Sequence, residues 1–358
     1  MIHRYQKKGL NFVLDVNSGA VHLLDDISYA VSGLIDENMT EKCPESVVEA
    51  LPQYAADDVR EAYGELYELK KAGQLFAQDD YIDVSRYIPV NAPVKALCLH
   101  VAHDCNLRCK YCFASTGDFG QGRKIMPPEV AKKAIDFVIA RSGKRRNIEV
   151  DFFGGEPLMA WDTVTQTVDY ARSIEEQHGK KFRFTITTNG LLLDEDKRKY
   201  INENMDNCVL SLDGRREVND EFRKTVAGTG SYDTIVPKFK ALVDERDPNL
   251  DYYARGTFTS HNLDFAEDVL SIADAGFDRL SVEPVTADPG CGYDLTEDDL
   301  PKIEAEYDRL TDIMLERKKE GKPFTFFHFM VDLDQGPCVV KRLRGCGAGY
   351  EYVAVTPD

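Results

Sequence analysis

From residue 95 onwards, six apolar, strand-like segments alternate with stretches of helical periodicity. The predicted strands are Ala96–Val101, Ile148–Phe153, Phe182–Thr187, Cys208–Leu212, Tyr252–Phe258 and Arg279–Glu283. The predicted helices cover about 128–141, 161–178, 194–204, 232–244, 263–275 and 297–320. Such alternation requires a parallel sheet with helical crossovers. Six units are too few to close an eight-stranded barrel, so we expect an α/β fold, an open, partial (β/α)6 TIM-like barrel over residues 95–320.

The first 85 residues have a different pattern and predict a separate, small α+β domain. Apolar residues alternate on both sides of a turn at 17–19, which is typical of a β-hairpin. The helical patterns that follow begin at Asp25, cover Ser46–Leu51, and run from about Asp57 to a capping Gly73. A hairpin and three helices in a unit of this size look like a winged helix-turn-helix. Residues 78–94 are interpreted as a linker.

The charge of this small domain bears on its partner. Residues 1–85 contain 16 acidic and 7 basic residues, a net charge of −9, whereas a DNA reader needs a basic face. We therefore favour capture of a peptide that adds as a strand to the hairpin edge. A purely structural cap is the alternative. The whole chain, with 62 acidic and 44 basic residues and a net charge of −18, should repel nucleic acid and anionic membranes.

No apolar run approaches the ~18 residues of a membrane span. The N-terminus has no uninterrupted apolar segment of the kind found in secretory signals. We therefore expect a cytoplasmic protein, in which thiols stay reduced and the nine cysteines do not form a disulfide framework.

Three of the nine cysteines, Cys105, Cys109 and Cys112, lie within eight residues in the loop that follows the first barrel strand. Barrel enzymes keep their active sites in such loops. A structural zinc site needs four ligands, and only His103 is close enough in sequence to be a fourth. Three thiolates can instead hold three irons of a [4Fe–4S] cluster and leave the fourth iron open. We expect these cysteines to bind a cluster.

The C-x3-C-x2-C spacing, with Tyr111 before the last cysteine, resembles the radical S-adenosylmethionine (SAM) enzyme superfamily. Gly154-Gly155-Glu156-Pro157 looks like the GGEP motif of that family, whose backbone and Glu receive the methionyl amino group of SAM. Two further motifs, Thr187-Thr188-Asn189-Gly190 and Ser211-Leu212-Asp213-Gly214, follow strands three and four.

The resemblance implies a role for individual residues. Ser211 and Asp213 would line the ribose and methionyl region, and Arg223 would pair with the SAM carboxylate. The cofactor-binding residues it implies are Tyr111, Gly154, Gly155, Glu156, Thr188, Asn189, Ser211, Asp213 and Arg223. A capped strand end, a turn Asn and an Arg in a surface salt bridge are the alternatives for the polar ones. No catalytic residue is assigned beyond the cluster, which would supply the electron that cleaves SAM to a 5′-deoxyadenosyl radical.

The C-terminal residues 321–358 are interpreted as a bridging region and the start of another domain. Gly336-Pro337-Cys338 and Arg344–Gly349, followed by Tyr350–Asp358, resemble the opening of a SPASM domain, which carries auxiliary clusters. The chain looks truncated there, so auxiliary [4Fe–4S] clusters are expected only in a full-length protein. Whether Cys338 and Cys346 are ligands stays open.

Taken together, the three parts resemble the radical SAM/SPASM peptide maturases, and most closely the SCIFF (six cysteines in forty-five residues) maturases, which form thioethers. The resemblance implies that the N-terminal domain is a RiPP recognition element that binds the leader of a Cys-rich precursor peptide. It also implies an electron donor such as flavodoxin or ferredoxin. Two alternatives remain: formylglycine formation, as in anaerobic sulfatase maturases, and a non-catalytic leader-binding or regulatory protein.

Overall fold

The computed structural model describes residues 1–79, 92–331 and 347–358. The chain divides into two compact units, one of Met1–Val90 with Val331–Gly347 and one of Asn91–Met330 with Ala348–Asp358. Most of the predicted linker lies outside the described residues, as do Cys338, Cys346 and the motif residues beside them. Among the described residues, no helix combines the length and the apolar character that crossing a membrane requires.

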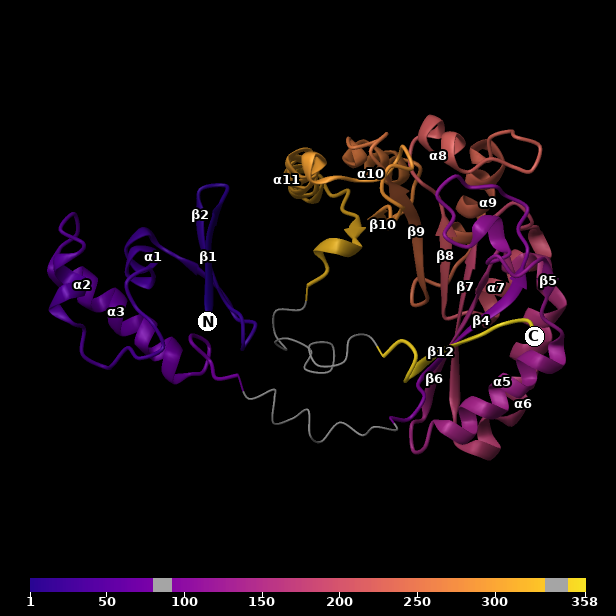
Figure 1. The fold of residues 1–358 in the computed structure, drawn as a ribbon, viewed down its shortest axis with the longest axis horizontal. Helices are drawn as coiled ribbons and strands as arrows, with labels where there is room; N and C mark the ends of the chain where they lie inside the picture. The colour runs from indigo at the N-terminus through magenta and orange to yellow at the C-terminus, as the bar shows by residue number, and fades with distance from the viewer. Residues whose placement is uncertain (80–91, 332–346) are drawn as a thin grey trace. The chain divides into compact units, whose positions relative to one another are not determined.

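The first unit is a three-stranded antiparallel sheet with three helices (Figure 1). The strands are β1 (Ile2–Lys7), β2 (Leu10–Asp15) and β3 (Val21–Leu24), paired in the order β1-β2-β3, and the helices are α1 (Asp26–Ser32), α2 (Glu45–Glu49) and α3 (Ala56–Lys71). The predicted hairpin corresponds to β2 and β3. Strand β1 was not predicted, because its sequence IHRYQK lacks the apolar alternation of a half-buried strand. The core of this unit includes Val13, Val31, Val59, Tyr63 and Leu66.

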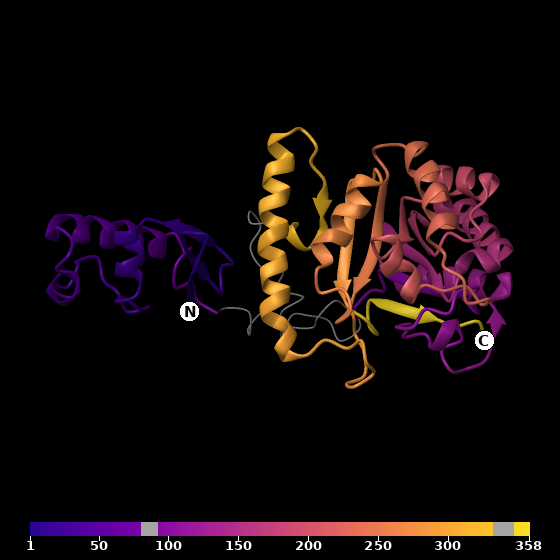
Figure 2. The ribbon, with the colours of Figure 1, turned by 90° about the horizontal axis from the view of Figure 1, so that it is seen from above.

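The second unit is a twisted, open parallel sheet with its helices on one side (Figures 1 and 2). Its main strands are β4 (Ala96–His103), β6 (Asn147–Gly154), β7 (Lys181–Thr188), β8 (Asn207–Ser211), β9 (Asp251–Phe258) and β10 (Arg279–Pro284). The short strands β11 (Thr325–Phe326) and β12 (Tyr352–Val355) extend it in parallel at its two ends, and β5 (Lys124–Ile125) pairs antiparallel with β4. The sheet order is β11-β10-β9-β8-β7-β6-β4-β12. All six predicted strands are present, and the sheet does not close.

Helices join the successive parallel strands. They are α5 (Pro128–Arg141), α6 (Trp161–His178), α7 (Glu195–Asn204), α8 (Arg216–Phe222), α9 (Tyr232–Asp244), α10 (Phe265–Asp274) and α11 (Leu300–Lys319). All except the short α8 match a predicted helix. Four 3-10 turns, η1 (Ser115–Gly117), η2 (Pro157–Ala160), η3 (Glu297–Asp299) and η4 (Phe327–Phe329), complete the unit.

Successive side chains of a strand point to opposite faces of the sheet, and this determines which face packs in the core and which face can carry a site. On β6, Ile148, Val150 and Phe152 are fully buried in the core that also holds Val164 and Val168 of α6. Burying one such large side chain stabilises the fold by about 1.5–3 kcal/mol. Residues between them, such as those at 151 and 153, point to the other face of the sheet, because successive side chains of a strand alternate. That inner face is therefore free to carry polar groups.

The C-terminal strand β12 adds to the edge of β4, with Tyr352 opposite Ala96 and Val355 opposite Leu99. The Tyr352 hydroxyl donates to Asp151 Oδ2 on β6 at 2.8 Å. The resemblance implies that Tyr350–Asp358 belongs to the opening of a SPASM domain, and this stays a prediction. In the structure, the apolar strand Tyr352–Val355 of this segment pairs with the edge of the barrel sheet.

Candidate active site

A cavity of about 580 Å³ lies at the carboxyl ends of the parallel strands of the second unit. Active sites of parallel α/β sheets occupy this edge, where the loops after the strands converge. Eleven of the twelve residues that the sequence singled out line it: Cys105, Cys109, Tyr111, Cys112, Gly154, Gly155, Glu156, Thr188, Asn189, Ser211 and Arg223. The twelfth, Asp213, is fully buried behind the cavity wall.

Backbone hydrogen bonds fix the loop that carries the three cysteines. Arg108 N donates to Lys224 O at 2.7 Å, and Lys110 N donates to Phe222 O at 3.0 Å, so the loop is tied to the segment after α8. Within the loop, Cys112 N donates to Cys109 O at 3.2 Å. The thiols are thus held on a backbone that the distant segment 222–224 supports.

The three cysteines are half-buried, and Cys105 and Cys109 are shielded enough for burial to act on their thiols. Burial raises the pKa of Cys105 to about 11 and that of Cys109 to about 12. The Cys105 sulfur accepts hydrogen bonds from Leu107 N at 3.4 Å and Asn189 Nδ2 at 3.6 Å. Buried thiolates need a nearby positive charge, and a bound metal centre supplies it. The donor set therefore fits a metal cluster.

The spacing of the thiols bears on the kind of metal centre. Within the described residues, no three His, Cys, Asp or Glu side chains gather closely enough to hold one metal ion. In a [4Fe–4S] cluster, each cysteine thiolate binds a different iron, so the three cysteines need not meet at one metal ion. His103, the candidate fourth zinc ligand, does not line the cavity; its ring lies beside His100 and Phe119. The geometry disfavours zinc.

Gly154 and Gly155 are glycines because there is no room for a side chain. Gly154 has φ +123°, a conformation that L-residues rarely adopt. A Cβ at Gly154 would collide with the carbonyl oxygen of Ala102, and one at Gly155 with the carbonyl oxygen of Asp104. In return, Gly155 N donates to Ala102 O at 2.7 Å. This close approach brings the end of β6 against the start of the cysteine loop.

Glu156 is buried, and the chain itself positions its carboxylate. Oε1 accepts from Leu158 N at 3.0 Å and Thr188 Oγ1 at 2.8 Å, and Oε2 accepts from Asn189 N at 2.8 Å. Burial raises the pKa of Glu156 to about 7, although these donors counteract the effect. A carboxylate has roughly four lone-pair sites, so one remains available to a ligand.

Asn189 connects the end of β7 to the cysteine loop. Its Nδ2 donates to Asn106 Oδ1 at 2.8 Å as well as to the Cys105 sulfur, and its Oδ1 accepts from Leu191 N at 3.0 Å. The predicted turn role and the predicted site role of Asn189 therefore coexist in one side chain.

Asp213 supports the wall of the cavity from behind. The Tyr111 hydroxyl contacts Asp213 Oδ1 at 2.8 Å and Oδ2 at 2.6 Å, and Thr257 N donates to Oδ1 at 3.0 Å. Arg223 Nε lies 3.0 Å from Asp213 Oδ2. Its N–H is not directed at the carboxylate, so this contact is an ion pair rather than a hydrogen bond. The sequence places Asp213 in contact with SAM; the structure gives it Tyr111 and Arg223 as partners.

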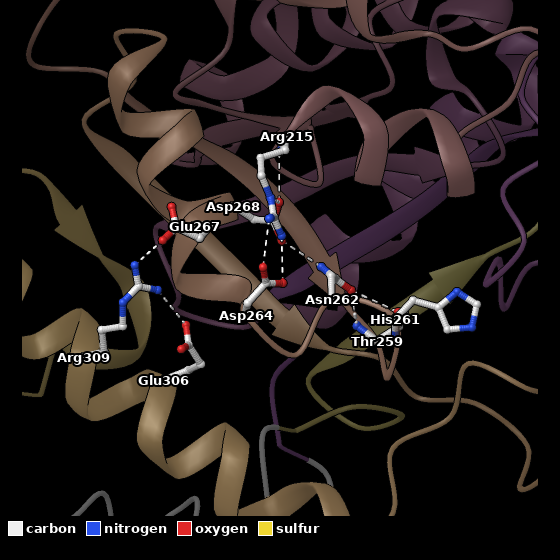
Figure 3. A network of polar contacts seen from close by, with 9 residues as sticks. All are labelled: Arg215, Thr259, His261, Asn262, Asp264, Glu267, Asp268, Glu306 and Arg309. Atoms are coloured by element: carbon white, nitrogen blue, oxygen red, sulfur yellow. Dashed lines mark hydrogen bonds and ion pairs between the residues drawn. The ribbon is translucent and has the colours of Figure 1, made fainter.

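A network of charges fixes the turn that follows Asp213 (Figure 3). Arg215 donates from Nε to Asp268 Oδ1 at 2.9 Å and from both Nη atoms to Asp264 at 2.8 Å. Asp268 is fully buried and also accepts from Asn262 Nδ2 at 2.9 Å. Gly214, at φ +131°, leaves no space for a Cβ beside Asp268. The turn that carries Asp213 is thereby locked to α10.

The sequence analysis missed the opposite wall of the cavity, which β9 and β10 form. Arg255 and Thr257 of β9 and Glu283 of β10 line it. The signal that could have found them is a charged residue near the carboxyl end of an otherwise apolar parallel strand, where barrel sites lie. Behind Glu283 lies His328, whose Nε2 is 2.9 Å from Glu283 Oε2.

Comparisons with known proteins agree with this geometry. Residues 99–252 match the sequence model of the Radical SAM superfamily. The chain is 29% identical over 197 residues to the radical SAM cyclopropyl synthase TigE of Paramaledivibacter caminithermalis, covering 50% of this chain and 40% of TigE. It is 30% identical over 143 residues to a cysteine-type anaerobic sulfatase-maturating enzyme of Clostridium novyi, covering 39% and 37%. The chain thus spans less than two thirds of either relative.

Among solved structures, the fold resembles that of Streptococcus suis SuiB bound to the precursor peptide SuiA. The TM-score is 0.55 at 15% sequence identity, over 99% of this chain and 80% of SuiB. SuiB has also been solved with bound S-adenosylmethionine. At this identity the likeness shows a common fold. Residues 99–252 are thus similar in sequence to the Radical SAM superfamily, whose members use a [4Fe–4S] cluster and S-adenosylmethionine as cofactors.

Proposed function

We propose that this protein is a peptide-modifying radical SAM enzyme that installs Cys-to-carbon thioether cross-links in a Cys-rich precursor peptide. The observation that carries the proposal is the composition of the single cavity. Three thiols and the Glu156 carboxylate lie on one wall, and the charged pair Arg255 and Glu283 lies on the other. The first wall suits the cofactors, and the second leaves room and polar groups for a substrate.

Cys105, Cys109 and Cys112 would hold the cluster. When bound, the cluster and SAM supply a 5′-deoxyadenosyl radical after one-electron reduction by a donor such as flavodoxin or ferredoxin. The chain contributes binding, orientation and exclusion of water. Its own hydrogen bonds, such as that from Asn189 to Cys105, keep the thiols in place.

The remaining motif residues would bind SAM. The free lone pair of Glu156 and the backbone at Gly154 and Gly155 suit the methionyl ammonium group. Arg223 lines the cavity and suits the methionyl carboxylate, because Asp213 and Tyr111 keep its guanidinium at the wall. Ser211, at the end of β8, lines the cavity and would contact the ribose. Glu156 and Arg223 are each held by other residues of the chain, as a preorganised site requires.

A peptide substrate is supported by the relatives. SuiB has been solved with a precursor peptide, and its likeness covers 99% of this chain, both units included. Oxidation of a cysteine to formylglycine, as in the sulfatase-maturating relative, is the second candidate. A non-catalytic leader-binding protein is less consistent with the cavity, since packing alone does not require three half-buried thiols and a buried carboxylate in one place.

The first unit would bind the leader. Strand β3 is at the end of its sheet, and its side chains Val21 and Leu23 are exposed. An added strand gains main-chain hydrogen bonds from such an edge and side-chain contacts from its apolar residues. Residues 1–85, with their net charge of −9, favour a leader with basic or apolar anchors over DNA.

The decisive experiment supplies the anaerobically reconstituted protein with SAM, a reductant and two peptides. The first is a Cys-rich precursor with its leader, and the second is a sulfatase-derived Cys peptide. We expect the precursor to lose two hydrogens and keep all its sulfur, as mass spectrometry would show. Loss of sulfur from either peptide would indicate formylglycine formation instead. An unchanged precursor that nevertheless binds the protein would favour the non-catalytic alternative.

The leader-binding role has its own test in the full chain. Leu23→Glu places a charge on β3 and should weaken leader binding at least tenfold, because it removes an apolar anchor at the strand edge. Leu34→Glu is the matched control, because Leu34 is also exposed but lies outside the sheet. Equal leader affinity for both variants, measured by fluorescence anisotropy, would argue that this unit is a structural cap.

A further inference from the structure

Glu283 is the one carboxylate on the substrate wall of the cavity, among the described residues that line it. It lies near the carboxyl end of β10, and its carboxylate is held on both sides. Oε1 accepts from Ser281 Oγ at 2.5 Å, and Oε2 lies 2.9 Å from His328 Nε2. Each oxygen retains a second lone pair. The Glu283 side chain is 28% exposed, so a molecule in the cavity can reach it.

The Glu283 carboxylate determines which nitrogen of His328 carries the proton. An ionised carboxylate can only accept, so His328 Nε2 donates to Glu283. His328 Nδ1 lies 2.7 Å from the hydroxyl of Tyr307 on α11. In the neutral imidazole, Nδ1 carries no proton and accepts from this hydroxyl. The chain Tyr307–His328–Glu283 is thus oriented toward the cavity.

The charges around Glu283 favour its ionised form. Burial pushes the pKa of Glu283 upward, but the hydrogen bonds from Ser281 and His328 and the nearby positive charge of Arg255 outweigh it, so the pKa lies below its usual range. These groups come from β10 itself, from η4 and from β9. At neutral pH, Glu283 is therefore a carboxylate with lone pairs free to accept a proton.

We propose that Glu283 is the proton acceptor for the substrate thiol, and that His328 and Tyr307 are positioning residues that hold its carboxylate toward the cavity. This inference rests on the proposed function, because a substrate cysteine must lose its proton before its sulfur can bond to carbon. A general base must lie within hydrogen-bond reach of the atom that carries the proton, about 2.6–3.2 Å between heavy atoms. Glu283 lines the same cavity as the proposed cofactor residues, so a thiol bound there can come within that reach.

In the proposed reaction, one C–H bond and one S–H bond of the peptide break, and one C–S bond forms. A C–H bond of the peptide breaks, and its hydrogen atom passes to the 5′-deoxyadenosyl radical to give 5′-deoxyadenosine. The thiol S–H bond breaks, and its proton passes to Glu283. The sulfur then bonds to the carbon radical, and the one surplus electron goes to a one-electron acceptor of the iron–sulfur class. The peptide loses two hydrogens, and Glu283 later returns its proton to water.

The test is the ratio of cross-linked peptide to 5′-deoxyadenosine in the full-length, reconstituted Glu283→Gln variant, measured from pH 6 to pH 9. At pH 7 we expect this ratio to fall by about 10²-fold, the lower end of the range for general acid–base catalysis. It should recover toward pH 9, because a free thiol with a pKa of about 8.5 ionises without help. Glu316→Gln, at an exposed position of α11, is the control and should match the wild type.

The positioning role has a separate readout. His328→Phe removes the donor to Glu283 and should reproduce part of the loss, whereas His328→Gln keeps an N–H and should restore most of the activity at pH 7. A Glu283→Gln variant with the wild-type ratio at every pH would overturn the proposal. Formylglycine formation by the wild type would overturn the proposed function instead. In that case the ratio of formylglycine to 5′-deoxyadenosine in Glu283→Gln and wild type would test Glu283, since that oxidation also removes a thiol proton.

Discussion

The two walls of the cavity are built differently. On the wall formed by β4 to β8, the side chains of Glu156, Asn189 and Asp213 are buried and hydrogen-bonded to other parts of the chain. On the wall formed by β9 and β10, Arg255 is exposed, and its guanidinium makes no hydrogen bond or ion pair with any described residue, although its charge helps to keep Glu283 ionised. A fixed wall suits cofactors that do not vary, whereas a guanidinium without a hydrogen-bonded partner suits a substrate.

The largest expected effect belongs to the fixed wall. Cys109→Ala should abolish SAM cleavage, because two thiolates do not hold a cubane that needs three. Iron content and 5′-deoxyadenosine formation are the measurements. Cys291→Ala is the control, since Cys291 is exposed and lies outside the cavity. Undiminished 5′-deoxyadenosine from the Cys109 variant would remove the cysteine loop from the cofactor wall.

The two arginines provide the sharpest contrast between the walls. Arg223→Ala should weaken SAM binding by about 2–3 kcal/mol, the range for loss of one partner from a desolvated charge pair. It should also lower stability, because Asp213 would remain buried without its counter-charge. Arg255→Ala should leave SAM affinity within a factor of three and raise the KM for the peptide. Isothermal titration with SAM and steady-state kinetics would measure both effects. If Arg255→Ala weakened SAM binding and Arg223→Ala raised only the KM for the peptide, the assignment of the two walls would be reversed.

A smaller effect is expected from Tyr111→Phe, which removes the hydroxyl that contacts both oxygens of Asp213. Hydrogen bonds to charged groups contribute about 1.5–3 kcal/mol, so the variant should lose about that much free energy of unfolding. Tyr170→Phe is the control: its hydroxyl contacts Asp136 on the surface, and its loss should cost well under 1 kcal/mol. Equal stability losses in the two variants, measured by urea denaturation, would show that Asp213 is not held in the way described.

The smallest effect concerns the rim beyond β9. His261 Nδ1 lies 2.8 Å from Glu221 Oε1, and this contact and the Gly292 carbonyl raise the pKa of His261 above 6.5. The pair therefore stabilises the protein fully below pH 6.5, and the contribution is lost as the pH rises through the pKa of the folded state. Because both side chains are exposed, His261→Asn should cost less than about 1 kcal/mol at pH 6. A stability difference from the wild type that does not shrink toward pH 9 would contradict this origin.

The sequence predicted the fixed wall far better than the open one, and the reason is physical. Gly154, Gly155 and the three cysteines are residue types that only a few backbone and chemical situations require, so they are conspicuous in a sequence. Arg255 and Glu283 are common residue types, and their meaning depends on the register of strands 26 residues or more apart, such as Leu280 opposite Ala254.

Similar limits apply to the fold. The six parallel strands are apolar enough to be found by inspection. Strand β1 and helix α8 depend on tertiary contacts, because their sequences lack apolar periodicity of their own. The ion pair between Asp213 and Arg223 joins residues on either side of α8 and could not be inferred without it.

The crowding at Gly155 also bears on how this site can evolve. A side chain there would meet a backbone carbonyl, that of Asp104, rather than another side chain. A clash between two side chains can be relieved by a second substitution that makes the neighbouring side chain smaller, and the two positions then change together during evolution. The carbonyl of Asp104 is common to every amino acid and accepts the Glu156 N–H at 2.9 Å, so no exchange at position 104 makes room. Position 155 is therefore cut off from compensatory mutation and should tolerate only glycine, whatever the genetic background.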